Sequence, residues 1–208
     1  MMWNRSSRKS SENRSSESKS YTGSRSHKDK SPKVEGFASA QEAYDCALNL
    51  LSYRDFSDKK MKERLQLKGA DEEQAEEAIA KLQHYGLLDE QRYAARVFEG
   101  WLNKRCYGRQ HLRAELVKRG IRAELVQEVL ERLTPALEAQ QAANAAELFV
   151  QRHREKIAQA QAQDLDHKTK QQLKNKIYAA GGRFMASHGF STEYMQILWE
   201  KMQVNNDI

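Results

Sequence analysis

Residues that form turns are scarce in this sequence. Its 208 residues include two prolines and ten glycines, and no run approaches the roughly 20 apolar residues that a membrane-spanning helix needs. The N-terminus has no apolar core of the kind that a signal peptide carries. The two cysteines, Cys46 and Cys106, lie far apart and lack metal-ligand spacing. We therefore expect a cytoplasmic protein with reduced thiols and no membrane segment.

Recognisable catalytic and cofactor-binding motifs are also missing. The sequence contains neither G-x-x-x-x-G-K-[ST] nor G-x-G-x-x-G, so it has no recognisable glycine-rich loop for binding nucleotide phosphates. Its six histidines form no H-E-x-x-H motif and have no cysteine partners, which argues against a metal site. The carboxylates of residues 71–77 fall at solvent-facing helix positions. We expect a protein that is not an enzyme and that needs neither a cofactor nor a metal.

What the sequence does contain favours helices. It is 39% hydrophobic and 31% charged, and it is rich in Ala, Glu, Gln, Lys, Arg and Leu, which have high helix propensity. Residues 61–82 and 112–133 repeat one pattern at an offset of 51 positions without a gap, and a shorter copy spans 184–202. Repetition at a fixed period is typical of arrays of similar units. The expected fold class is therefore all-α, built from tandem three-helix repeats.

Each copy predicts a helix, a turn that contains glycine, and a second amphipathic helix. In the middle copy Gly120 supplies the left-handed residue that ends the first helix. With Gly120 at position C′, Leu116 and Ile121 occupy the two positions that touch in a Schellman cap. Equivalent pairs in the other copies are Leu65 with Ala70 and Met185 with Phe190.

Capping, proline and aromatic residues outside the repeated pattern indicate where helices start and which positions lie in the core. Ser57 and Asp89 each stand where an N-cap is needed, because their side chains can accept a hydrogen bond from the first turn. Thr134-Pro135 ends the second unit, since a proline disfavours helix in the residue before it. Phe98 and Trp101 are expected to be core residues rather than a platform for stacked bases.

Composition and the positions of turn-forming residues divide the chain into four segments. In order, they are a disordered Ser/Lys/Arg-rich extension at 1–36 and three-helix repeats at 37–86, 87–135 and 136–208. The third repeat carries a polar insertion, residues 151–176, which forms either a pair of extended solvated helices or a partly mobile loop. Gly181-Gly182 is expected to kink or shorten the helix that contains it.

Positive charge is unevenly distributed. The net charge is +6, and residues 1–36 supply +5 of it, from nine Lys or Arg against four Asp or Glu. This extension is either a solubilising segment or a polyelectrolyte arm that adds non-specific attraction to nucleic acid. The basic isoelectric point therefore does not by itself indicate a nucleic-acid-binding fold.

A second basic concentration lies inside the folded region. Residues 92–122 hold nine Lys or Arg against two glutamates. Such a density suits contact with phosphates or with an acidic protein surface, although an ordinary solvated face can have the same composition. Two helices that meet at a glycine turn also resemble a helix-turn-helix module. Their side chains do not form a pattern typical of contacts with DNA bases, so we do not expect sequence-specific DNA recognition. The predicted contact residues are Arg92, Arg96, Lys104, Arg105, Arg109, Arg113, Lys118 and Arg119.

Several motifs resemble those of the RecX regulatory proteins, bacterial modulators of the RecA recombinase. They are Gly86-Leu-Leu-Asp-Glu-Gln-Arg-Tyr-Ala94, the spaced Gly108…Leu112…Leu116…Gly120-Ile121, and Phe184-Met-Ala-Ser-His-Gly-Phe190 with its helix. The resemblance covers roughly residues 40–203. It implies an elongated, curved array of three-helix units that binds the RecA filament on DNA. It also implies modulation, mostly inhibition, of RecA ATP hydrolysis, strand exchange and coprotease activity in DNA repair and the SOS response.

Other function classes fit the same residues. A basic helical protein that binds DNA or RNA without a recombinase partner would show affinity that falls steeply with salt and does not depend on RecA. A scaffold for some other protein would show neither behaviour. Family members also bind DNA to varying degrees, so single- or double-stranded DNA is a second expected partner. Nothing in the sequence demands a dimer, and we expect a monomer.

Overall fold

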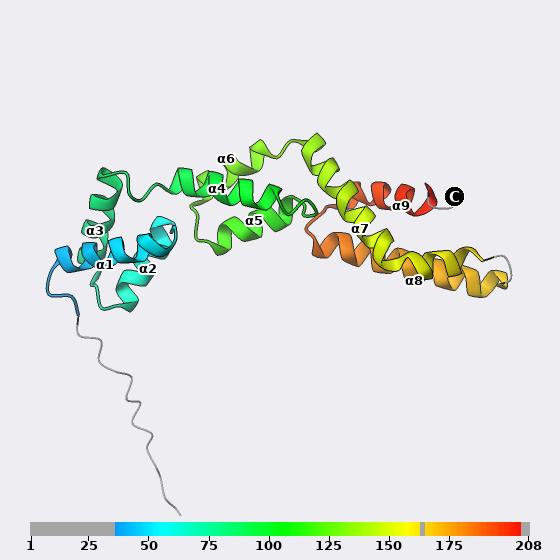
Figure 1. Ribbon diagram of the computed structural model, residues 1–208, viewed down its shortest axis with the longest axis horizontal. Coiled ribbons are helices and arrows are strands. Elements are labelled where there is room, and N and C mark those ends of the chain that lie inside the picture. The colour runs from blue at the N-terminus through cyan, green and yellow to red at the C-terminus, as the bar shows by residue number, and fades with distance from the viewer. Residues whose placement is uncertain (1–35, 163–164, 205–208) are drawn as a thin grey trace, which may run out of the picture. The chain divides into compact units, whose positions relative to one another are not determined.

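The computed structural model of the protein describes residues 36–162 and 165–204, and this part of the chain is all-helical (Figure 1). The predicted disordered extension lies outside the described residues, apart from Gly36. In chain order the helices are α1 (Ala40–Tyr53), α2 (Asp58–Leu67), α3 (Glu72–His84), α4 (Glu90–Leu102), α5 (Arg109–Lys118), α6 (Ala123–Arg132), α7 (Pro135–Gln161), α8 (His167–Ser187), the short 3-10 helix η1 (Thr192–Tyr194) and α9 (Met195–Val204).

Three hydrophobic clusters divide these helices into consecutive groups. The first cluster joins α1, α2 and α3 around Met61 and Leu82, the second joins α4, α5 and α6 around Trp101, and the third joins α7, α8 and α9 around Phe149. Each of these four side chains is almost fully buried. The all-α class and the tandem three-helix organisation are therefore confirmed. The residue boundaries of the repeats stay predictions.

The predicted caps are present at the ends of α2, α5 and α8. Gly69, Gly120 and Gly189 have φ values of 106°, 75° and 83°, in the left-handed region that glycine tolerates. In α5 the amide of Ile121 donates to the carbonyl of Leu116 at 3.2 Å, which is the bond that defines a Schellman cap. The equivalent bonds close the other two helices, from Ala70 to Leu65 at 3.0 Å and from Phe190 to Met185 at 3.1 Å.

Helix starts and core positions also follow the sequence. The side chains of Ser57 and Asp89 accept hydrogen bonds from the first turns of α2 and α4, as predicted. Pro135 is the first residue of α7, where its missing N–H costs nothing. Phe98 and Trp101 are buried, and their rings stack 6.3 Å apart at an interplanar angle of 11°. They are core residues of the second cluster.

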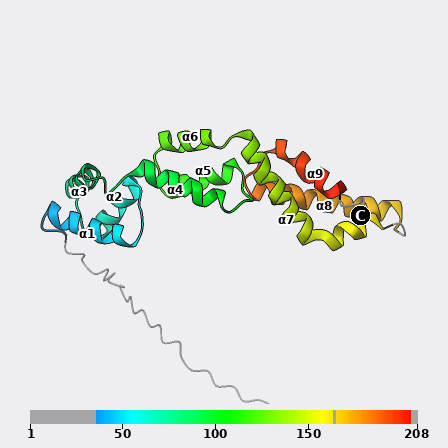
Figure 2. The same ribbon diagram turned by 45° about the horizontal axis from the view of Figure 1, so that its top comes forward.

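The described part of the polar insertion, residues 151–162 and 165–176, is mostly helical. Helix α7 extends to residue 161 and α8 begins at residue 167, and the two lie side by side (Figures 1 and 2). This is the first of the two predicted alternatives, a pair of extended helices. The expected shortening of the helix at Gly181-Gly182 is wrong, because α8 runs through both residues. Gly181 is instead a close-packing position, since a Cβ there would lie 2.7 Å from Leu198 of α9.

Neighbouring groups of helices meet through the ends of their second helices. The carbonyl of Arg119, at the end of α5, accepts a hydrogen bond from the Ser57 hydroxyl at the start of α2, at 2.7 Å. The same contact recurs one unit later, where the amide of Gly108 at the start of α5 donates to the carbonyl of His188 at 2.8 Å. Each contact places the negative end of one helix dipole against the positive end of another, which is favourable.

Two glycines allow the second of these junctions to form. The amide of Gln110 donates to the carbonyl of Gly189 at 3.1 Å, so the backbones of α5 and of the turn after α8 nearly touch. A Cβ on Gly108 would lie 2.5 Å from the Gly189 carbonyl oxygen, and a Cβ on Gly189 would overlap the backbone nitrogen of His111. The junction therefore requires glycine on both sides.

Candidate interaction groove

A groove with an excess of positive charge lies between the first and second groups of helices. One hollow of about 720 Å³ lies between α2 and α5, and a second of about 300 Å³ adjoins it along α4. They share Asp55, Tyr93, Glu115 and Arg119, so together they form one surface, which we call the basic groove. It is lined by seven cationic side chains and three carboxylates. The cations are Arg54, Lys60, Arg64, Arg96, Lys104, Lys118 and Arg119.

Some of this charge is neutralised within the groove. Arg96 pairs with Asp55 at 2.7 Å, and Arg119 pairs with Glu115 at 2.7 Å. The hydrogen bond from Arg119 lowers the pKa of Glu115, which therefore stays ionised. Arg64 and Lys118 are exposed and have no carboxylate partner among the described residues. The unneutralised charge of the groove therefore resides on side chains that an external partner can reach.

The structure separates the eight predicted contact residues. Arg96, Lys104, Lys118 and Arg119 line the basic groove. Arg92 instead lines a hollow between α4 and α6 that also contains Asp89 and Glu128, so its surroundings are mixed in sign. Arg105 has φ of 59° in the turn after α4, and Arg113 is exposed on α5 outside the groove. The structure therefore does not bring these residues to one surface.

Arg109 has an internal role. Its side chain pairs with the buried carboxylate of Glu138 at 3.1 Å, and it donates to the carbonyls of Leu130 and Leu133 at 2.8 and 2.6 Å. Its backbone amide also donates to Glu138 at 2.8 Å. Arg109 thus joins the start of α5 to the end of α6 and to α7, and most of its donors are occupied. Whether it also contacts a partner stays a prediction.

The cations that the first group of helices contributes to the groove were not predicted from the sequence. Lys60 and Arg64 are four residues apart on α2, so they share a face, and Arg54 follows α1. Glu63 lies between these residues and masks the local charge excess. The i, i+4 spacing of Lys60 and Arg64 was the available signal, but their proximity to α5 depends on the junction at Ser57.

A half-buried histidine, His111, lies beside the groove. The indole N–H of Trp101 donates to Nδ1 of His111 at 3.1 Å, and the ring of Tyr107 stacks on His111 with centroids 3.9 Å apart. Burial, helped by the positive charge of Lys104, lowers the pKa of His111 below its usual value of 6.5. The hydrogen bond also requires that Nδ1 carry no proton.

Acidification from about pH 8 to about pH 5 is therefore expected to lower the melting temperature. Because the pKa of His111 is lower in the folded than in the unfolded protein, its contribution to stability is complete above 6.5 and is lost as the pH falls below that value. His111→Asn keeps an acceptor near the indole but does not titrate, so thermal melts of this variant should show a smaller loss. Equal losses in both proteins would show that His111 is not responsible.

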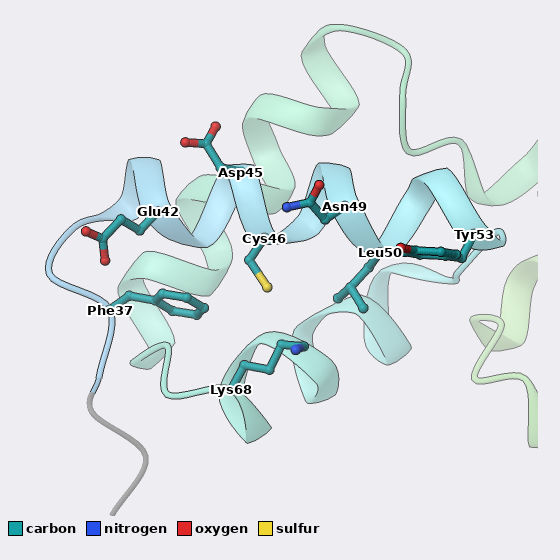
Figure 3. A pocket seen from close by; sticks show the side chains of 8 residues that line it. All are labelled: Phe37, Glu42, Asp45, Cys46, Asn49, Leu50, Tyr53 and Lys68. Carbon is teal, nitrogen blue, oxygen red and sulfur yellow. The ribbon is translucent and has the colours of Figure 1, made fainter.

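A further hollow of about 500 Å³ lies beside α1 (Figure 3). The sulfur of Cys46 points from α1 toward the segment that carries Lys68, and the ring of Phe37 lies beside this space. Its charged lining consists of Glu42, Asp45 and Lys68, so it lacks the positive excess of the basic groove. Both cysteines are free. In the described part of the chain no three His, Cys, Asp or Glu residues are grouped to hold a metal ion, and no helix is long and apolar enough to cross a bilayer.

The repeated three-helix units and the groove between them define a tandem helical-repeat protein, a class whose neighbouring units form extended binding surfaces. The family model for the first three-helix domain of RecX matches residues 43–82, and the model for the second matches residues 89–130. The regulatory protein RecX of Thermus thermophilus is 36% identical over 119 residues, which cover 57% of this chain and 78% of that protein. The chain belongs to the RecX family of regulatory proteins.

Other relatives match over shorter spans. The regulatory protein RecX of Caldanaerobacter subterraneus is 33% identical over 99 residues, 48% of this chain and 50% of that protein. That of Trichlorobacter lovleyi is 35% identical over 95 residues and is matched over 61% of its length. The chain thus spans half to three fifths of these two relatives. The crystal structure of RecX from Lactobacillus salivarius has a TM-score of 0.61 at 22% identity, covering 79% of this chain and 97% of that one, which shows a shared fold.

Proposed function

We propose that this chain regulates the RecA recombinase by binding the RecA filament on DNA. In this proposal it restrains RecA ATP hydrolysis, strand exchange and coprotease activity during DNA repair and the SOS response. Membership of the RecX family supports the regulatory role. The observation that carries the binding surface is the basic groove, with seven cations against three carboxylates at the contact between two units.

Stoichiometric binding rather than catalysis fits the groove. Its exposed cations can pair with acidic side chains or with phosphates, both of which a protein filament on DNA presents. Because α2 and α5 belong to different units, one partner segment in the groove would contact both units at once. Binding would then stabilise their junction as well as the complex.

The direct test is the single-stranded-DNA-dependent ATPase rate of RecA with this protein titrated in, at two salt concentrations. The expected result is a fall in rate at substoichiometric amounts that is largely retained at the higher salt. A fall seen only near saturation and lost with salt would instead indicate competition for DNA. An unchanged rate, with RecA and DNA both verified as active, would refute the proposal.

The groove itself is tested by reversing its exposed, unpaired charges. Arg64→Glu with Lys118→Glu is expected to raise the concentration needed for half-maximal inhibition about tenfold, because two favourable charge contacts become repulsive. The matched control makes the same change at Arg92 and Arg113, which are exposed and lie outside the groove. The control should shift this concentration less than about twofold. Equal shifts for both variants would mean that the groove is not the contact surface.

A further inference from the structure

A second concentration of positive charge without carboxylate partners among the described residues lies on α8. Helix α8 has no Asp or Glu along its 21 residues. Its five cationic residues are Lys168, Lys170, Lys174, Lys176 and Arg183. A helix of this length with one sign of charge repels itself in water, and salt or a polyanion relieves that repulsion.

The cations of α8 differ from those of the middle unit in their partners. Among the nine basic residues of 92–122, four form ion pairs with carboxylates, namely Arg96, Arg109, Arg119 and Arg122. None of the five cations on α8 pairs with a carboxylate among the described residues. Lys170 donates to the carbonyl of Gln161 at 3.4 Å, and all of them except Lys170 are exposed.

Three of these cations form a stripe on the solvent face of α8. Lys168, Gln172, Lys176 and Arg183 are separated by four, four and seven residues, so they follow one side of the helix. At 1.5 Å per residue, the three cations are about 12 Å and about 10 Å apart along the axis. The opposite side of α8, which includes Ile177 and Met185, is buried in the third hydrophobic cluster. The stripe therefore points away from the core.

No described carboxylate forms an ion pair with this stripe. Asp166, the N-cap of α8, accepts a hydrogen bond from the amide of Thr169 at 3.0 Å, and bonds from Thr169 lower its pKa. Glu200 on α9 accepts a hydrogen bond from the side-chain amide of Gln196 at 3.0 Å. Glu155, on α7, is exposed and stands between Arg154 and Lys156. Asp164 lies outside the described residues.

The chemistry of the stripe favours one class of partner. Protein interfaces concentrate aromatic residues, Met and Arg at their centre and are depleted in Lys. The solvent face of α8 presents Lys, Arg, Gln and Asn with small residues such as Ala179, and its large apolar side chains face the core. Lys, Arg, Gln and Asn are among the side chains that contact phosphate oxygens. Regularly spaced phosphates therefore match this face better than an acidic protein surface does.

We propose that the solvent face of α8, through Lys168, Gln172, Lys176 and Arg183, binds the phosphodiester backbone of nucleic acid without reading its sequence. This site is separate from the basic groove and does not require RecA. It gives the third unit a function of its own, because the extension of α7 and α8 is what presents the stripe.

The test is fluorescence anisotropy of labelled oligothymidylate and of a labelled duplex of mixed sequence, titrated with the full chain in the absence of RecA. The variant replaces Lys168, Lys176 and Arg183 by Gln, which removes charge and keeps good helix propensity. At about 0.1 M salt we expect affinity to fall at least about tenfold. The slope of log K against log salt should become shallower by about 2.7 for the duplex and by about 2 for the single strand, the values for three lost phosphate contacts.

The matched control replaces Lys59, Arg92 and Arg113 by Gln, which changes the net charge equally at exposed positions on other helices. Its affinity and salt slope should stay close to those of the unmodified chain. Equal losses in both variants, or an α8 variant that binds within twofold of the unmodified chain, would overturn the proposal. Competition by polyglutamate as effective as that by unlabelled oligothymidylate would also overturn it, in favour of an acidic protein partner. Circular dichroism melts establish that the variants are folded.

Discussion

Gly189→Ala is expected to lower the free energy of unfolding by at least about 3 kcal/mol, measured by urea denaturation. The new Cβ would force a left-handed residue into a strained conformation and would overlap the backbone nitrogen of His111. A backbone atom cannot rotate away as a side chain can. The junction would open, and the bonds from Gly108 to His188 and from Gln110 to Gly189 would be lost.

Two glycines within α8 provide matched controls for this substitution in the turn after it. Gly182→Ala should be neutral or stabilising by up to about 1 kcal/mol, because nothing lies within 4 Å of its Cβ position and alanine favours helix. Gly181→Ala should be intermediate, since its new Cβ would meet the flexible end of Leu198 at 2.7 Å. The expected order of stability is therefore Gly182→Ala, then Gly181→Ala, then Gly189→Ala. If Gly189→Ala proved as stable as Gly182→Ala, the described junction would be wrong.

The second large effect is expected at Arg109. Arg109→Ala should destabilise the protein by about 3 kcal/mol, because it leaves the carboxylate of Glu138 buried without its cationic partner. It also removes the donors to the carbonyls of Leu130 and Leu133 at the end of α6. Urea denaturation with fluorescence detection measures the change. Arg105 lies four residues earlier in an exposed turn and provides the matched control. Arg105→Ala should lower the free energy of unfolding by less than about 1 kcal/mol.

A second substitution can show whether Arg109→Ala destabilises the protein through the buried carboxylate of Glu138 or only through the loss of a surface charge. Glu138→Gln should partly rescue Arg109→Ala, because the neutral amide does not need a cationic partner when it is buried. No rescue, together with an Arg109→Ala effect as small as that of Arg105→Ala, would contradict the internal role of Arg109. Charge changes at Arg109 in a binding assay therefore need a stability measurement beside them.

The helices and their caps could be predicted from the sequence because the forces that set them are local. A glycine that ends a helix and the apolar pair on either side of it fall within six residues, so the pattern around Gly120 contains the whole cap. The same cap pattern recurs 51 positions earlier, so it is unlikely to have arisen by chance. The same locality explains why Ser57 and Asp89 were recognised as N-caps.

The surface could not be predicted to the same degree, because charge counted along the chain does not show which charges are paired. Arg109 meets Glu138 from a different group of helices, 29 positions away. Arg96 meets Asp55 across the contact between two units. Gly181 was expected to kink or shorten a helix, whereas its close packing depends on Leu198 of α9. Each of these depends on tertiary contacts that a count of residues in a window does not contain.

The junction at Ser57 has a consequence for synthesis on the ribosome. The hydroxyl at the start of α2 donates to the carbonyl of Arg119, which is added to the chain 62 residues later. The first unit therefore emerges with this donor satisfied only by water, and it gains the contact when the second unit folds against it. The start of α5 in turn awaits His188 and Gly189. Stability is thus acquired in the order of translation, each unit being completed by the one that follows it.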